Sequence, residues 1–181
     1  MGAPLAVTIE NAGAASFPSA WKGYQVCASY DREAWFRVPS TDYDPATGHL
    51  SWTVEPAARS LWFAYFPPYS AERHAALVGE LQLLPGVELS VLGSSLDGRD
   101  LDLLRIGEPG PDRRSVWFVA RQHPGESMAE WFCEGLLRRL TDPHDPVARA
   151  LLQSTTFYVV PNMNPDGEEL RRELGRLNLV D

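Results

Sequence analysis

The sequence is short of cysteine and of long apolar runs, and each shortage excludes a class of protein. Its 181 residues include two cysteines, Cys27 and Cys133, which lie far apart and outside any CxxC pair. This predicts reduced, buried thiols in a cytoplasmic protein and not a disulfide framework. The longest apolar runs, such as residues 61–66, are too short to span a bilayer. Glu10 interrupts the first apolar stretch and no basic residues open the chain, so we expect no secretory signal peptide.

Basic residues are also scarce, and this limits the partners that we expect. Sixteen basic and 24 acidic side chains give a formal net charge of −8. Nucleic acids and anionic membranes are bound by basic surfaces, so we expect neither as a partner. Hydrophobic residues make up 44% of the chain, and they include enough Trp, Tyr and Phe for one medium domain or two small ones.

The first third of the sequence has the pattern of a small antiparallel β-sandwich. Short runs rich in Val, Tyr, Trp and Phe alternate with turn residues. The expected strands are 6–10, 23–30, 35–38, 50–54 and 61–66, with a turn at 42–48. Pro67 and Pro68 end this pattern, which predicts two domains, residues 1–67 and 68–181.

Beyond the prolines, strands alternate with helices, as in an α/β layer. Ser70 is expected to cap a helix that runs to about Leu83, and further helices are expected directly after Glu126 and at 145–153. Strands are expected at 88–93, 101–106, 116–120 and 157–160. The last two are continuous apolar runs, which are typical of strands buried on both faces.

Two metal-ligand side chains, His123 and Glu126, flank a Pro-Gly turn between the apolar run 116–120 and an amphipathic helix. Imidazole nitrogen and carboxylate oxygen are good ligands for Zn²⁺, and a sharp turn lets both side chains point at one spot. The carboxyl end of a buried strand is also where α/β proteins present ligands. A His-x-x-Glu pair arises often by chance, however, so a capping glutamate beside a surface histidine is the alternative.

A second polar segment, residues 162–167, also follows a predicted buried strand. Its Asn-Pro-Asp-Gly sequence is close to an ideal turn, so a plain turn is the simplest interpretation of these residues alone. If both strands are central in one sheet, this turn and the His123 turn would lie side by side over one cleft. A third segment, at 69–74, contains His74, which we expect on the helix surface or packed between domains.

Four motifs occur in the order seen in zinc carboxypeptidases, and the chain resembles the cytosolic branch of that superfamily. The segments before residue 40, which include 28–32 and 35–39, resemble the small β-domain of that branch. The resemblance covers nearly the whole chain up to Gly167. The motifs that carry it are residues 69–74, 96–99, 121–127 and 161–167.

The resemblance implies a fold, a cofactor and a substrate. The fold is an N-terminal antiparallel β-sandwich followed by a truncated carboxypeptidase-type α/β domain with a mixed central sheet. The cofactor is Zn²⁺, with His123 and Glu126 as two of its ligands. Arg121 and Asn164 would lie in the substrate cleft, and the substrate would be the C-terminus of a peptide or protein.

The family's third zinc ligand and its catalytic glutamate come later in sequence, and no residue of this chain matches them. His49, His74 and His144 lie at positions that the family does not use. After Gly167 the chain departs from the family pattern, and we expect about half of the catalytic domain to be missing. The isolated chain is therefore expected to be nearly inactive and to self-associate through an exposed sheet edge.

Two other functions are compatible with the same residues. One is a related amide hydrolase, such as an N-acyl amino acid deacylase, which also uses a His-x-x-Glu pair but would lack the N-terminal β-domain. The other is a non-enzymatic binding module, in which the β-domain contacts a partner and the remainder is vestigial. Bound zinc would distinguish a working site from the vestigial one.

Overall fold

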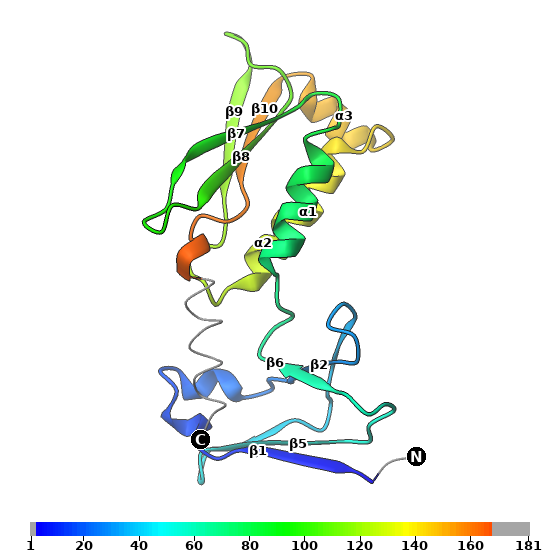
Figure 1. Cartoon of the computed structure of the whole chain (residues 1–181), viewed down its shortest axis with the longest axis vertical. Coiled ribbons are helices and arrows are strands. Elements are labelled where there is room, and N and C mark those ends of the chain that lie inside the picture. The colour runs from blue at the N-terminus through cyan, green and yellow to red at the C-terminus, as the bar shows by residue number, and fades with distance from the viewer. Residues whose placement is uncertain (1–2, 168–181) are drawn as a thin grey trace. The chain divides into compact units, whose positions relative to one another are not determined.

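The computed structural model describes residues 3–167, which belong to two compact units, one ending at Pro68 and the other beginning at Tyr69 (Figure 1). The predicted fold class is confirmed: the first unit contains antiparallel sheets, and the second combines helices with a mixed sheet. Within residues 3–167, no helix has the length and apolar character that crossing a membrane requires.

The first unit contains two three-stranded antiparallel sheets, ordered β1-β5-β4 and β3-β2-β6. Its core is an apolar cluster that includes Ala28, Leu50 and Trp52. The elements are β1 (Leu5–Ile9), η1 (Ala12–Ala14), η2 (Pro18–Trp21), β2 (Cys27–Ser29), β3 (Trp35–Arg37), β4 (Asp42–Asp44), β5 (His49–Val54) and β6 (Trp62–Ala64).

Strand β4 corrects the sequence prediction, which assigned residues 42–48 to a turn. Asp42–Asp44 pairs with β5 in an antiparallel register, and the turn proper begins after it. The carbonyl of Asp44 accepts a hydrogen bond from the Gly48 N–H at 2.8 Å, and its side chain accepts one from the Ala46 N–H at 2.9 Å. Aspartate is a common turn residue, which is why the sequence pattern predicted a turn from Asp42 onward. In the structure the turn begins only at Asp44, so Asp42 is still part of the strand.

The second unit has one four-stranded sheet in the order β7-β8-β10-β9. Strand β8 pairs antiparallel with both of its neighbours, whereas β10 and β9 are parallel, so the sheet is mixed. The elements are α1 (Ala71–Leu81), β7 (Val87–Ser94), β8 (Asp100–Ile106), β9 (Arg114–Val119), α2 (Ser127–Thr141), α3 (Pro146–Leu152) and β10 (Thr155–Val160).

Helices α1 and α2 lie next to each other against one face of this sheet (Figure 1). Their apolar stripes and the inward side chains of β8 and β10 form one cluster, in which Leu104, Leu137 and Val159 are fully buried. The Ser70 hydroxyl caps α1 by accepting the Arg73 N–H, as the sequence predicted. Within the described residues, these two helices therefore cover one face of the sheet.

Strand β9 was predicted to be buried on both faces, and this prediction was wrong. Val116 and Phe118 pack against the core, but Trp117 is 51% exposed and Val119 is 44% exposed. Trp117 stacks on Tyr158 of β10 at a centroid distance of 4.7 Å. An apolar run predicts two apolar faces, while helices of the described part of the chain cover only one of them.

The core position of Leu137 can be tested by truncation. Leu137→Ala should lower the free energy of unfolding by about 2–5 kcal/mol, because it leaves a cavity between α2 and the sheet. Leu96→Ala, at a fully exposed position, should change it by less than about 0.5 kcal/mol. Denaturant unfolding followed by circular dichroism would measure both, and equal effects would contradict this placement of the core.

Candidate metal site

The polar turns that follow β9 and β10 lie side by side, as expected from the sequence. Because the two strands are parallel, their carboxyl ends meet at the same edge of the sheet. The pairing continues beyond the strands: the Ala120 N–H donates to the Val160 carbonyl, and the Met163 N–H donates to the Ala120 carbonyl, each at 2.9 Å. The two turns thus extend one parallel ladder.

His123 and Glu126 lie on the first of these turns, between β9 and α2. His123 Nδ1 is 3.1 Å from Glu126 Oε1, and the two side chains are 76% and 55% exposed. Glu126 occupies the N-cap position of α2, but its side chain makes no capping hydrogen bond. Of the alternative, a capping glutamate beside a surface histidine, the exposed histidine is present and the capping hydrogen bond is not.

The backbone of the His123 turn is held at three successive carbonyls. The Gln122 carbonyl accepts Asn164 Nδ2 at 3.1 Å, and the Pro124 carbonyl accepts Arg121 Nε at 3.1 Å. Between them, the His123 carbonyl accepts the Glu126 N–H at 3.0 Å. Each acceptor has a donor, so the turn that bears the two ligand-type side chains has a defined backbone path.

Arg121 has an unusual backbone conformation, with φ at +53°. A non-glycine residue in this region costs about 1–3 kcal/mol and persists where its surroundings determine it. Arg121 is 5% exposed, and its Nη1 donates to the Tyr69 carbonyl at 3.1 Å and to Glu130 Oε2 at 2.5 Å. The predicted contact of Arg121 with substrate stays a prediction, and the side chain is seen in contact with protein groups.

Asn164 and Gly167 shape the second turn. Asn164 Oδ1 accepts the Gly167 N–H at 3.0 Å, while the other end of the same amide binds the first turn. A Cβ atom at position 167 would lie 2.3 Å from Pro124 Cγ, so the two turns approach closely where a side chain would collide. The contact of Asn164 with substrate likewise stays a prediction.

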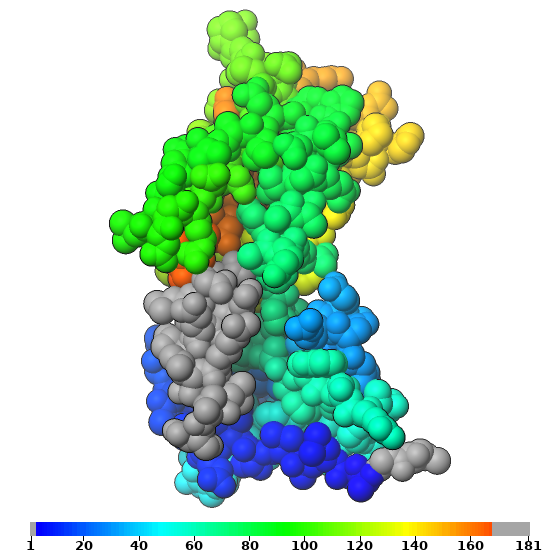
Figure 2. All heavy atoms as spheres, viewed as in Figure 1, coloured from blue at the N-terminus to red at the C-terminus, as the bar shows by residue number. Residues whose placement is uncertain are grey.

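Asp166 joins the second turn to the β7–β8 hairpin, whose tip lies beside these residues on the surface (Figure 2). Its carboxylate accepts the Ser95 hydroxyl at 2.7 Å, the Asp97 N–H at 3.0 Å and Arg99 Nη1 at 2.7 Å. The motif at 96–99 and the motif at 161–167, which are separate in sequence, are therefore in direct contact.

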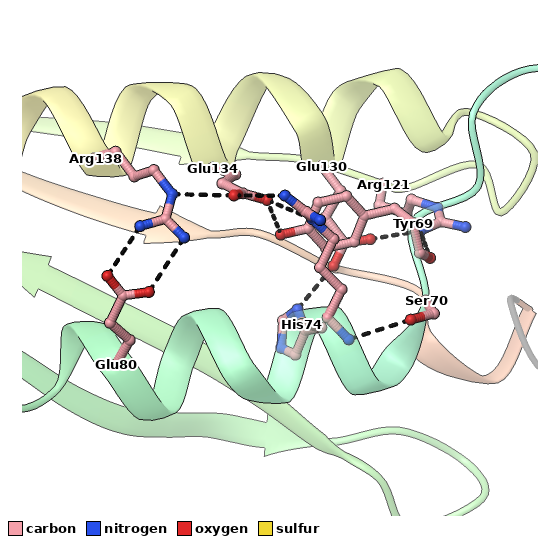
Figure 3. Close-up of polar contacts among 9 residues, drawn as sticks. Tyr69, Ser70, His74, Glu80, Arg121, Glu130, Glu134 and Arg138 are labelled. Atoms are coloured by element: carbon pink, nitrogen blue, oxygen red, sulfur yellow. Dashed lines mark hydrogen bonds and ion pairs between the residues drawn. The ribbon is translucent and has the colours of Figure 1, made fainter. Parts of the chain in front are cut away.

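Two buried carboxylates on α2, Glu130 and Glu134, face α1 (Figure 3). Glu134 accepts Arg73 Nε at 2.8 Å, Arg138 Nε at 3.0 Å and the Tyr69 hydroxyl at 2.8 Å. Burial raises the pKa of Glu134, but these hydrogen bonds outweigh it and lower the pKa to about 2. The sequence interpretation did not single out either glutamate, although both interrupt the apolar stripe of α2 four residues apart.

His74 was expected at the helix surface or between the domains, and it lies instead between two carboxylates of the second unit. Its Nδ1 is 2.7 Å from Glu130 Oε1 and its Nε2 is 2.9 Å from Asp102 Oδ2. Burial lowers the pKa of His74, but its hydrogen bonds to Glu130 and Asp102 and their charges together raise it above its usual range. His74 thus joins Asp102 to Glu130, the carboxylate that also accepts Arg121.

Comparison with known proteins matches both units to one group of enzymes. Residues 1–66 match the cytosolic carboxypeptidase N-terminal domain, and residues 82–180 match the zinc carboxypeptidase family. The chain belongs to the zinc carboxypeptidase family. The family assignment made from the four motifs is therefore confirmed.

Two relatives show how much of the chain is shared with other proteins. The chain is 47% identical over 163 residues to an uncharacterized protein of Zymomonas mobilis, covering 90% of this chain and 41% of that protein. It is 34% identical over 112 residues to cytosolic carboxypeptidase 6 of Mus musculus, covering 58% of this chain and 21% of that protein.

Solved structures that resemble this chain include two metallo-carboxypeptidases. The metallo-carboxypeptidase of Burkholderia cenocepacia is 48% identical with a TM-score of 0.85, covering 91% of this chain and 44% of that one. The metallo-carboxypeptidase of Pseudomonas aeruginosa, in complex with (2-guanidinoethylmercapto)succinic acid, is 47% identical with a TM-score of 0.83, covering 92% of this chain and 44% of that one. This chain spans less than half the length of each of these relatives.

The family implies zinc, and the first turn carries two side chains of the types that bind this ion. His123 and Glu126 supply a nitrogen and an oxygen donor whose atoms already converge at 3.1 Å and are accessible to solvent. Among residues 3–167, no three His, Cys, Asp or Glu side chains are grouped closely enough to hold a metal ion. The described residues of the second unit therefore offer two donors that suit part of a zinc site, and His74 and His144 are not grouped with them.

The position of His74 predicts how stability depends on pH. Because its pKa is higher in the folded than in the unfolded chain, protonated His74 stabilises the fold below its usual pKa of 6.5. This contribution is lost as the pH rises through the raised pKa. Denaturant unfolding of the wild type should therefore show decreasing stability above about pH 6.5.

The variant His74→Gln should have a flatter stability profile over the same pH range. His144→Gln, at an exposed histidine in the same unit, serves as the control and should keep the wild-type profile. Parallel profiles for wild type and His74→Gln would show that His74 does not titrate between its two carboxylates.

Proposed function

We propose that His123 and Glu126 are two of the zinc ligands of a metallocarboxypeptidase, which hydrolyses C-terminal peptide bonds of a peptide or protein in the cytoplasm. The observation that carries the proposal is the convergence of His123 Nδ1 and Glu126 Oε1 at 3.1 Å, at the carboxyl end of β9. A catalytic zinc site uses three protein ligands and leaves one position for water, so these residues supply two of three.

Zinc bound at this turn would supply a Lewis acid that polarises the scissile carbonyl group. In this chain, His123 and Glu126 would hold the ion from one side, because both extend from a single turn whose three carbonyls have donors. Asn164 is proposed to line the substrate cleft, since its amide lies beside the same turn.

The substrate class follows from the family and from one relative. A substrate's terminal carboxylate needs a cationic or hydrogen-bonding partner next to the metal. The Pseudomonas aeruginosa relative binds a guanidino derivative of succinic acid, a compound with two carboxyl groups. Such a ligand is consistent with a cleft that accepts the C-terminus of a chain.

The deacylase alternative has less support than the carboxypeptidase proposal. It would lack the N-terminal β-domain, whereas residues 1–66 match the N-terminal domain of cytosolic carboxypeptidases. The cytoplasmic location that we propose rests on the same match. The non-enzymatic binding module differs from the enzyme in one measurable property, which is zinc binding.

Zinc titration tests the proposed ligands directly. The wild-type chain should bind one Zn²⁺, and His123→Ala and Glu126→Ala should each weaken binding by at least about tenfold, because each removes a donor. His144→Ala, at an exposed histidine, should bind as the wild type does. Isothermal titration calorimetry measures the affinities, and the imidazole NMR signals of His123 identify the site.

Unchanged zinc affinity in His123→Ala would contradict the ligand assignment. A wild-type chain that binds no zinc would favour the binding module.

We also propose that the chain self-associates through β9. This strand is at one end of the described sheet and presents Trp117 and Val119 to solvent. Sedimentation velocity should show a mass that rises with concentration, and Trp117→Lys should lower it. Phe17→Lys, at a 78% exposed aromatic residue of the first unit, should have no effect. A monomer at all concentrations would contradict the proposal.

A further inference from the structure

We propose that Glu130 is a positioning residue for the zinc-binding turn. Through Arg121, its carboxylate would hold the backbone on which His123 and Glu126 converge. The inference rests on the proposed zinc site for its consequence, but its geometric basis is a set of contacts among protein groups. The Glu130 carboxylate accepts a hydrogen bond from Arg121 and lies against His74, so it would act on the turn through Arg121.

The guanidinium of Arg121, which lies beside Glu130 in Figure 3, is the physical link between Glu130 and the turn. Its Nη1 donates to Glu130 Oε2, while its Nε donates to the carbonyl of Pro124, the residue directly after His123. The group is planar and rigid, so its donors keep a fixed arrangement. Anchoring one side on Glu130 therefore determines where the other side holds the Pro124 carbonyl.

The backbone of Arg121 also needs this anchor. A φ of +53° is costly for a residue with a side chain, and arginine does not have the short polar side chain with which asparagine and aspartate tolerate it. The contacts that Arg121 makes with Glu130, Tyr69 and Pro124 hold the residue in this conformation. Without the Glu130 carboxylate, the strained backbone conformation at Arg121 would lose one of the contacts that stabilise it.

Glu130 is well placed to serve as an anchor because it is itself fixed. It is fully buried on α2, one turn beyond Glu126. Its second oxygen lies 2.7 Å from His74 Nδ1 on α1, and His74 reaches Asp102 on β8. Both carboxylate oxygens thus have cationic or hydrogen-bonding partners, and three elements of the unit determine the position of the side chain.

Glu134 provides a matched comparison within the same helix. It is also a buried carboxylate, and its partners are Arg73, Arg138 and the Tyr69 hydroxyl, all outside residues 121–126. Its link to Arg121 is indirect, because Arg121 binds the backbone carbonyl of Tyr69 and not the hydroxyl that Glu134 accepts. If Glu130 is an ordinary buried ion-pair partner, removing either charge should have the same consequences. If Glu130 positions the turn, only its removal should change the turn.

The experiment compares Glu130→Gln with Glu134→Gln in the 181-residue chain. Both should lower the melting temperature, because each leaves arginines beside a neutral amide. Amide hydrogen exchange of Glu126, whose N–H donates to the His123 carbonyl, reports the turn without metal. Dividing this rate by that of Leu137, in the middle of α2, removes the effect of global unfolding.

In Glu130→Gln this exchange ratio should rise by about tenfold, and the Zn²⁺ affinity measured by calorimetry should fall by about tenfold. In Glu134→Gln both should stay within about twofold of the wild type. Arg121→Lys is the second variant. Lysine keeps a cation beside Glu130 but has no second donor to reach the Pro124 carbonyl. Arg121→Lys should therefore weaken zinc binding while lowering the melting temperature less than Glu130→Gln does.

Equal changes in Glu130→Gln and Glu134→Gln, or an unchanged exchange ratio in Glu130→Gln, would overturn the positioning role. Failure of the wild-type chain to bind Zn²⁺ would instead contradict the proposed ligands. In that case the exchange ratio, measured without metal, still decides whether Glu130 holds the turn.

Discussion

The parallel pairing of β9 with β10 is the constraint on which the candidate site depends. It places the carboxyl ends of both strands at one edge of the sheet, and the ladder of hydrogen bonds continues through Ala120 and Met163 into the turns. An antiparallel pairing would have put the two turns at opposite edges. Because the strands are far apart in sequence, α2 and α3 between them serve as the crossover connection that parallel pairing requires.

The interface between α1 and α2 contains buried polar and charged side chains as well as apolar ones. Helices α1 and α2 meet through the carboxylates of Glu130 and Glu134 as well as through leucines. Buried charges need partners in excellent geometry, and here arginines, His74 and Tyr69 provide them. The same network reaches the His123 turn, because Glu130 binds Arg121 and Arg121 binds the Pro124 carbonyl. These residues therefore contribute both to helix packing and to the candidate site.

Much of this arrangement could be predicted from local patterns. Alternation of strands and helices predicted the α/β unit, and Ser70 predicted the start of α1. The His123 and Asn164 turns were found because polar residues directly after apolar runs are conspicuous. Exposure of one face of β9 could not be predicted, since it depends on which elements cover the sheet. The roles of His74 and Glu130 were also hidden, because they arise from contacts between α1, α2 and β8.

The close approach of Gly167 to Pro124 ties two segments that are far apart in sequence. A side chain at position 167 would collide with the Pro124 ring, and Asn164 bonds both turns. A displacement of one turn would therefore strain its contacts with the other, so we expect the two turns to move together. The position of the His123 imidazole would then depend on both turns, although only one of them carries it.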